Sequence, residues 1–116
     1  MLDERTAEVA ATSRPTEPAI SRTLVKLSLL EGFFEKFIDL PEPSLTVHPE
    51  GMDVSLQLPE DIAGPRERCL AVARIAQELR GTTRLVAVSD WWSFMTDVGF
   101  GGLHIHVYAP LHREDA

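Results

Sequence analysis

Apolar residues recur at two different spacings along this chain, and the spacing separates helices from strands. After Ser21, large apolar side chains return every three or four residues, which is typical of a helix that buries one face. The stripe consists of Leu24, Leu27, Leu30, Phe34 and Phe37, and it is widened by Val25, Leu29, Phe33 and Ile38. We expect Ser21 to cap this helix, Pro41 and Pro43 to end it, and Lys26, Glu31, Glu35 and Lys36 to face solvent.

The width of this stripe leaves two interpretations open, because it exceeds what one sheet face usually covers. Either the helix is deeply buried within the fold, or part of it contacts another chain. Under the second interpretation, Leu29 and Phe33 are candidate interface residues.

A hairpin is predicted next, because apolar and polar residues alternate on both sides of a turn. Leu45 and Val47 alternate with Thr46 and His48, and residues 52–58 repeat this period of two. Pro49-Glu50-Gly51 supplies the turn. Such strands form an antiparallel sheet with one face in water.

The second helix is predicted between Pro65, which suits a first turn, and Gly81, which suits an exit. Its buried stripe is expected to contain Ile62, Cys69, Val72, Ala76 and Leu79, with Leu70, Ala73 and Ile75 beside it. Arg66, Arg68 and Arg74 are interpreted as the solvated side of this helix. Cys69 is interpreted as a small core residue rather than a nucleophile, since no base lies near it in sequence.

The last third of the chain is predicted to be extended, with strands at 85–88, 92–98 and 103–108. Ser89-Asp90 is the expected reversal point, and residues 99–102 form a glycine-rich turn. One long bent strand through residues 88–98 is the alternative. Pro110 is expected to stop the final strand.

Together these elements predict an α+β domain in two layers, with the order α-ββ-α-βββ. Two helices would cover one face of a mainly antiparallel sheet of four or five strands. The domain would span residues 21–110, between a leader at residues 1–20 and a polar tail at 111–116. The leader is either disordered or ordered by a partner, for example as a short helix at residues 3–12. Over residues 52–108 the element order is similar to one module of the vicinal-oxygen-chelate proteins, without any metal-ligand motif that would carry a function across.

Composition excludes some classes of function. The chain has 116 residues and a net charge of −7, which disfavours nucleic acid as a partner. One cysteine and no apolar segment of membrane-spanning length predict a reduced, cytoplasmic protein without a membrane partner. The excess of arginine and alanine suggests a GC-rich genome, a phage or a mobile element.

Candidate chemistry gathers on the predicted open face of the sheet. His104 and His106 point to the same side of the final strand, and His48 and Asp53 lie on the polar side of the first hairpin. If these strands adjoin, the four side chains suit a zinc site. The alternatives are an exposed strand without a ligand, a polar ligand pocket, or an interface that responds to pH.

On one strand the adjacent Trp91 and Trp92 must face opposite sides, so both are candidate interface residues. The alternative is that a reversal near Asp90 lets both pack in the core. No catalytic signature is found, so no catalytic residue is assigned and no cofactor is expected unless zinc binds. The sequence therefore favours a small acidic protein-interaction or regulatory domain, whose partner is another protein or a second copy. The alternative is a metal- or small-ligand-binding enzyme that uses the histidines.

Overall fold

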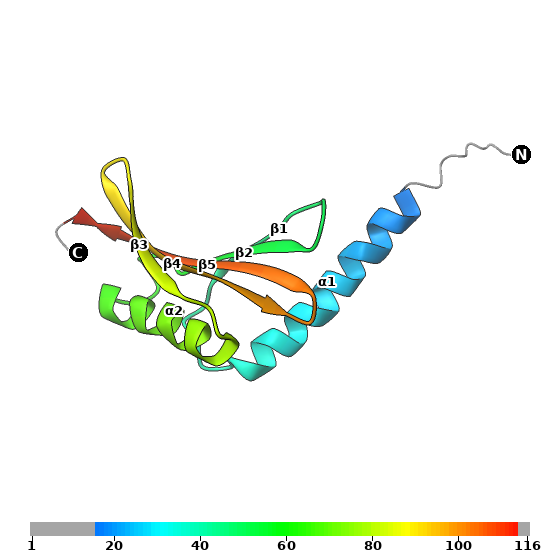
Figure 1. The fold of residues 1–116 in the computed structure, drawn as a ribbon, viewed down its shortest axis with the longest axis horizontal. Coiled ribbons are helices and arrows are strands. Elements are labelled where there is room, and N and C mark those ends of the chain that lie inside the picture. Colours follow the sequence, from blue (N-terminus) through cyan, green and yellow to red (C-terminus); the bar gives the residue numbers. More distant parts are fainter. Residues whose placement is uncertain (1–15, 114–116) are drawn as a thin grey trace, which may run out of the picture.

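A five-stranded sheet with two helices forms the structure, as shown by a computed structural model that describes residues 16–113, with side chains from residue 20. In chain order the elements are α1 (Thr16–Lys36), β1 (Ser44–Val47), β2 (Asp53–Gln57), α2 (Pro65–Leu79), β3 (Thr83–Val88), β4 (Trp91–Phe100) and β5 (Leu103–His112). The strands are arranged in the order β1-β2-β5-β4-β3 (Figure 1). The predicted α+β class and element order are confirmed.

Three of the four strand pairs are antiparallel, and only β2 and β5 run parallel. Between β2 and β5 the chain passes through α2, β3 and β4, and this long connection brings β5 back beside β2 in the same direction. The reversal at Ser89-Asp90 is confirmed, since Ser89 has a φ of 56° between β3 and β4. The alternative of one long bent strand is therefore wrong.

One apolar core lies between the helices and the sheet. It contains Leu30, Phe33 and Phe37 of α1, Val72 and Ile75 of α2, and inward-facing residues of β2, β4 and β5. The ring of Phe33 contacts those of Phe34, Phe37 and Phe100. Phe33 is 0% exposed, so this predicted interface residue lies in the core and not on the surface. Leu29 is half-buried against the same core.

Helix α1 begins earlier than the sequence indicated. It starts at Thr16, so Ser21 lies inside the helix and does not cap it. Pro18 falls in the first turn, where a missing backbone N–H breaks no hydrogen bond. Residues 16–20 therefore belong to the helix and not to a leader, while residues 1–15 of the predicted leader lie outside the described residues.

The first half of α1 extends away from the sheet (Figure 1), and this changes which residues it buries. The buried stripe runs through Lys26, Leu30, Phe33 and Phe37, whereas Leu24 and Leu27 are exposed.

Two cations predicted to face solvent are buried. Lys26 is 0% exposed, and its Nζ donates to the carbonyl of His48 at 2.7 Å. Arg68 is 1% exposed, and it donates to the carbonyls of Ala63 at 2.9 Å and Pro110 at 2.6 Å. Both side chains satisfy backbone oxygens that would otherwise be left without partners.

The final strand continues through Pro110 to His112, beyond its predicted end, and Leu111 is buried. Even-numbered residues of β5 direct their backbone groups to the β2 side, since His104 N donates to Met52 O and Leu58 N donates to Tyr108 O. Pro110 lies past this contact, so its missing N–H costs no strand hydrogen bond. Of the predicted polar tail, residues 111–112 therefore belong to β5, Arg113 follows the strand, and residues 114–116 lie outside the described residues.

Candidate functional site on the open face of the sheet

The strand register collects polar side chains on the face of the sheet that neither α1 nor α2 covers (Figure 1). Asp53 pairs with His104 and Ser55 with His106 across β2 and β5, and Asp97 of β4 pairs with His106 from the other side. Paired residues point to the same face of a sheet. The predicted face for His104 and His106 is therefore correct, and it also holds Asp97, which sequence reasoning did not single out.

A hollow of about 540 Å³ lies at this end of the face. We call it the His–Asp hollow; it is lined by His48, Pro49, Glu50, Asp53, Val54, Ser55, Asp97, His104 and His106. All four predicted ligand residues line it.

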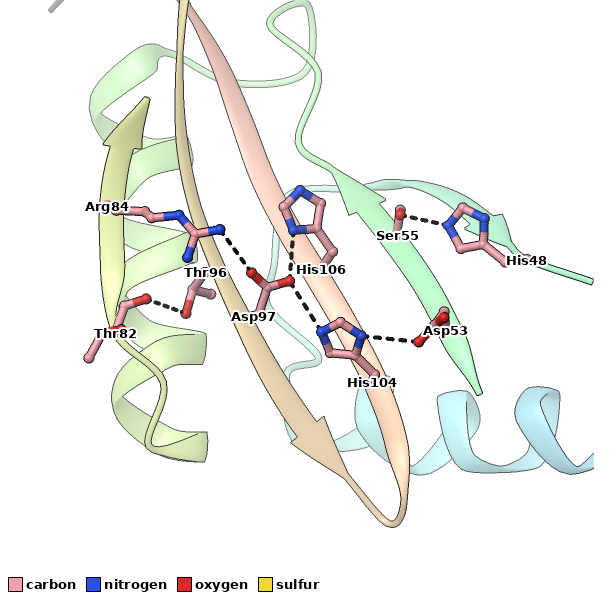
Figure 2. Close-up of polar contacts among 9 residues, drawn as sticks. All are labelled: His48, Asp53, Ser55, Thr82, Arg84, Thr96, Asp97, His104 and His106. Atoms are coloured by element: carbon pink, nitrogen blue, oxygen red, sulfur yellow. Dashed lines mark hydrogen bonds and ion pairs between the residues drawn. The ribbon is translucent and has the colours of Figure 1, made fainter. Parts of the chain in front are cut away.

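A hydrogen-bonded network that reaches four strands, β2, β5, β4 and β3, meets in this hollow (Figure 2). His104 Nδ1 lies 3.0 Å from Asp53 Oδ1, and its Nε2 lies 3.3 Å from Asp97 Oδ1. His106 Nδ1 lies 2.9 Å from the same Asp97 oxygen, and Arg84 Nη2 lies 3.3 Å from the other.

Asp97 is the centre of this network. Burial tends to raise the pKa of Asp97, but the hydrogen bond from His106 and the charges of His106, His104 and Arg84 outweigh it. Together they hold that pKa below the ordinary value of 3.8. Asp97 is therefore ionised at neutral pH, and it orients the ring of His106.

His48 joins the hollow from the other side, where its Nε2 lies 2.9 Å from Ser55 Oγ. Its backbone carbonyl is the acceptor of the buried Lys26 ammonium. The side chain of Lys26 thus connects α1 to the end of β1 and positions the loop that carries His48 and Glu50.

The predicted metal ligands come together on one face, but they are not in direct contact as a set. The ring of His48 is hydrogen-bonded to Ser55, and the ring of His104 is hydrogen-bonded to Asp53. Among residues 16–113, no group of three or more His, Cys, Asp or Glu side chains is arranged to hold a metal ion.

A second hollow, of about 320 Å³, is lined by Trp91 and Pro110 of the sheet, which project from the same face. We call it the Trp91 hollow; its other lining residues are Gln57, Pro59, Glu60 and Asp61. The Trp91 ring lies 4.2 Å from the ring of His112, and His112 Nε2 lies 3.0 Å from Glu60 Oε2. His112, which was assigned to a polar tail, therefore supports this hollow.

The two tryptophans face opposite sides of β4, as predicted. Trp91 is 37% exposed on the open face, beside Ser93 and Met95. Trp92 is half-buried on the helix side, the side that holds Phe94 and Val98.

Ser93 has an unusual environment between the hollows. It is 8% exposed, and it lies across from Pro110 on β5. Its hydroxyl is buried without a hydrogen-bond partner within the described chain.

Carboxylates dominate the charge of both hollows. No lysine or arginine is among the described residues that line them. Asp97 is paired with Arg84, Asp53 with His104, and Glu60 with His112. Glu50 in the His–Asp hollow and Asp61 in the Trp91 hollow form no ion pair within residues 16–113.

Outside this face, the remaining candidates from the sequence are separated. Arg74 of α2 pairs with Asp39 on the helix side, whereas Arg84 lies on the open face, so these two arginines do not form one basic patch. Cys69 is half-buried, and burial raises the pKa of its thiol against the opposing charge of Arg68.

The extended half of α1 exposes Ile20, Leu24, Val25 and Leu27. Self-association through this helix stays a prediction, which sedimentation equilibrium would test.

Neither described helix combines the length and apolar content needed to cross a membrane. Comparisons of the chain with protein-family models, curated proteins and solved structures gave no match.

Proposed function

We propose that the chain is an acidic protein-interaction domain, and that its open sheet face binds a basic segment of a partner protein. The observation that carries this proposal is the charge of the two hollows. Each holds one carboxylate that has no ion pair within residues 16–113, and neither is lined by a described lysine or arginine. Opposite charges across an interface favour encounter and exclude partners of the wrong sign.

Two further features support a basic partner. The net charge of −7 attracts a cationic chain from a distance. Trp91 offers an exposed aromatic ring next to Glu60 and Asp61, and lysine and arginine side chains bind favourably over such a ring. The proposal includes the cytoplasmic location and the phage or mobile-element setting expected from composition.

Calorimetric titration of a lysine-rich peptide tests this function, with a glutamate-rich peptide of equal length as the first control. We expect the basic peptide alone to bind, and its affinity to fall with added salt, because the contacting charges are exposed. The double variant Glu50→Gln/Asp61→Asn should weaken binding about fivefold, as expected for two exposed ion pairs of about 0.5 kcal/mol each.

The matched control is Glu31→Gln/Glu35→Gln, which removes the same charge from exposed positions of α1. If both double variants weaken binding equally, net charge alone attracts the peptide and the open face is not the site. Equal binding of the acidic peptide would also contradict the proposal.

The alternative function, a histidine site for zinc or a small ligand, is favoured by one observation. Carboxylates hold Nδ1 of both His104 and His106, an arrangement that also orients metal-binding histidines. Bound zinc would raise the midpoint of thermal unfolding, and His106→Ala would abolish this rise. A midpoint of thermal unfolding that does not change when zinc is added would contradict a zinc site.

A further inference from the structure

The two hollows lie at different points along the same strand, so their separation can select a ligand. His104 and His106 of β5 line the His–Asp hollow, and Pro110 of β5 lines the Trp91 hollow. Four to six residues of an extended strand span about 13–20 Å. Between the hollows on this face lies Tyr108, whose ring stacks on that of His106 with a centroid distance of 5.2 Å.

On the basis of the proposed function, we infer that the open face is a two-point site for an extended peptide whose two lysine or arginine residues stand four or six positions apart. One cationic side chain enters the His–Asp hollow near Glu50, and the other enters the Trp91 hollow near Asp61. An extended chain alternates its side chains between two sides, so only an even separation directs both toward the sheet. Four and six positions cover about 13 and 20 Å, which are the spans from His106 and from His104 to Pro110 along β5.

The two points differ in what they offer a cation. Near Glu50, the carboxylates of Asp53 and Asp97 are held in place by His104 and His106, so the charge is fixed in position. Near Asp61, the Trp91 ring and the proline rings of Pro59 and Pro110 also offer apolar contact for the methylene groups of the side chain.

The test is a set of peptides of equal length and charge, each with two lysines in a glycine-serine background, separated by two, four, six or ten positions. Linking two weak sites raises the affinity only when the ligand spans both. We expect the peptides with separations of four and six to bind the whole chain more tightly than those with two or ten.

Two single variants show whether both points are used. Glu50→Gln and Asp61→Asn each remove one carboxylate that has no ion pair within residues 16–113, so neither breaks a pair with a histidine. Each variant should weaken binding of the peptides with separations of four and six about twofold, as expected for the loss of one exposed ion pair, and should reduce the preference for these separations. Glu35→Gln on α1 should leave the preference unchanged.

The outcomes separate this inference from the proposed function. Equal binding of all spacings, with weaker binding in Glu50→Gln and Asp61→Asn, would overturn the two-point site and leave the basic-peptide function in place. If no basic peptide binds, both are overturned. A preference that is unchanged in Glu50→Gln or Asp61→Asn would overturn the assignment of the two points.

Discussion

The His–Asp hollow and the Trp91 hollow lie on the same sheet face but are built differently. In the first, most lining side chains project from neighbouring strands, so strand register sets the distances between Asp53, Asp97 and the histidines. In the second, Trp91 and Pro110 of the sheet meet the loop residues Pro59, Glu60 and Asp61. The first hollow therefore fixes charge by hydrogen bonding, whereas the second adds an aromatic surface.

The hollows share one feature, which is a buried cation that holds the backbone of a lining residue. Lys26 of α1 donates to the carbonyl of His48, and Arg68 of α2 donates to the carbonyl of Pro110. Both cations are almost fully buried. The shape of the open face thus depends on side chains from the helices, and the two hollows can be disturbed independently.

The largest effect is expected from Arg68→Met, which leaves the carbonyls of Ala63 and Pro110 without this donor. We expect the free energy of unfolding to fall by about 3 kcal/mol, the sum of two charged hydrogen bonds less the gain from burying an apolar side chain. Denaturant unfolding measures this change, and the exposed Arg66→Met is the control, with less than about 0.5 kcal/mol expected. Equal stability of the two variants would show that Arg68 does not support the Trp91 hollow.

A smaller effect is expected from Lys26→Met, because Lys26 makes one hydrogen bond where Arg68 makes two. The unfolding free energy should fall by about 1.5 kcal/mol, and amide exchange should rise around His48 but not around Pro110. Lys36→Met, at an exposed ion pair with Glu78, is the control and should change stability by less than about 0.5 kcal/mol. Faster exchange at both hollows would contradict their independence.

Trp91→Leu tests whether the aromatic surface of the Trp91 hollow contributes to peptide binding. Affinity for a basic peptide should fall about threefold, as expected for an exposed cation–π contact, while the dependence of affinity on salt stays the same. Trp92→Leu is the matched control, because Trp92 faces the helix side and should affect stability rather than binding. A weaker salt dependence in Trp91→Leu would mean that the ring acts by positioning the carboxylates.

The smallest effect is expected from Asp97→Asn and depends on pH. Because the folded-state pKa of Asp97 is lowered, the ionised carboxylate stabilises the fold fully above the ordinary value of 3.8. The stabilisation by the ionised carboxylate is lost as the pH falls through the lowered pKa of Asp97. The difference in unfolding free energy between the wild type and Asp97→Asn should therefore be constant near neutrality and shrink in acid. A difference that grows in acid would contradict the network.

Alternation of apolar and polar residues was enough to predict the fold and the face of His104 and His106, because β2 and β5 keep a period of two. Asp97 obeys the same alternation, but its place beside His106 depends on the register of β4 against β5, which the sequence of one strand does not contain. Lys26 and Arg68 were assigned to solvent because charged side chains are usually exposed. Their burial depends on backbone carbonyls 22 and 42 residues away along the chain.

The central claim is that the open face of the sheet is the binding surface, and chemical-shift mapping tests it most directly. A lysine-rich peptide titrated into the isotope-labelled chain should shift backbone amides of β5 from His104 to His112 and of β4 from Trp91 to Asp97. Amides of α2 should remain unchanged. Shifts confined to α1 and α2 would contradict the account, because they would place the basic ligand on the helix side of the sheet.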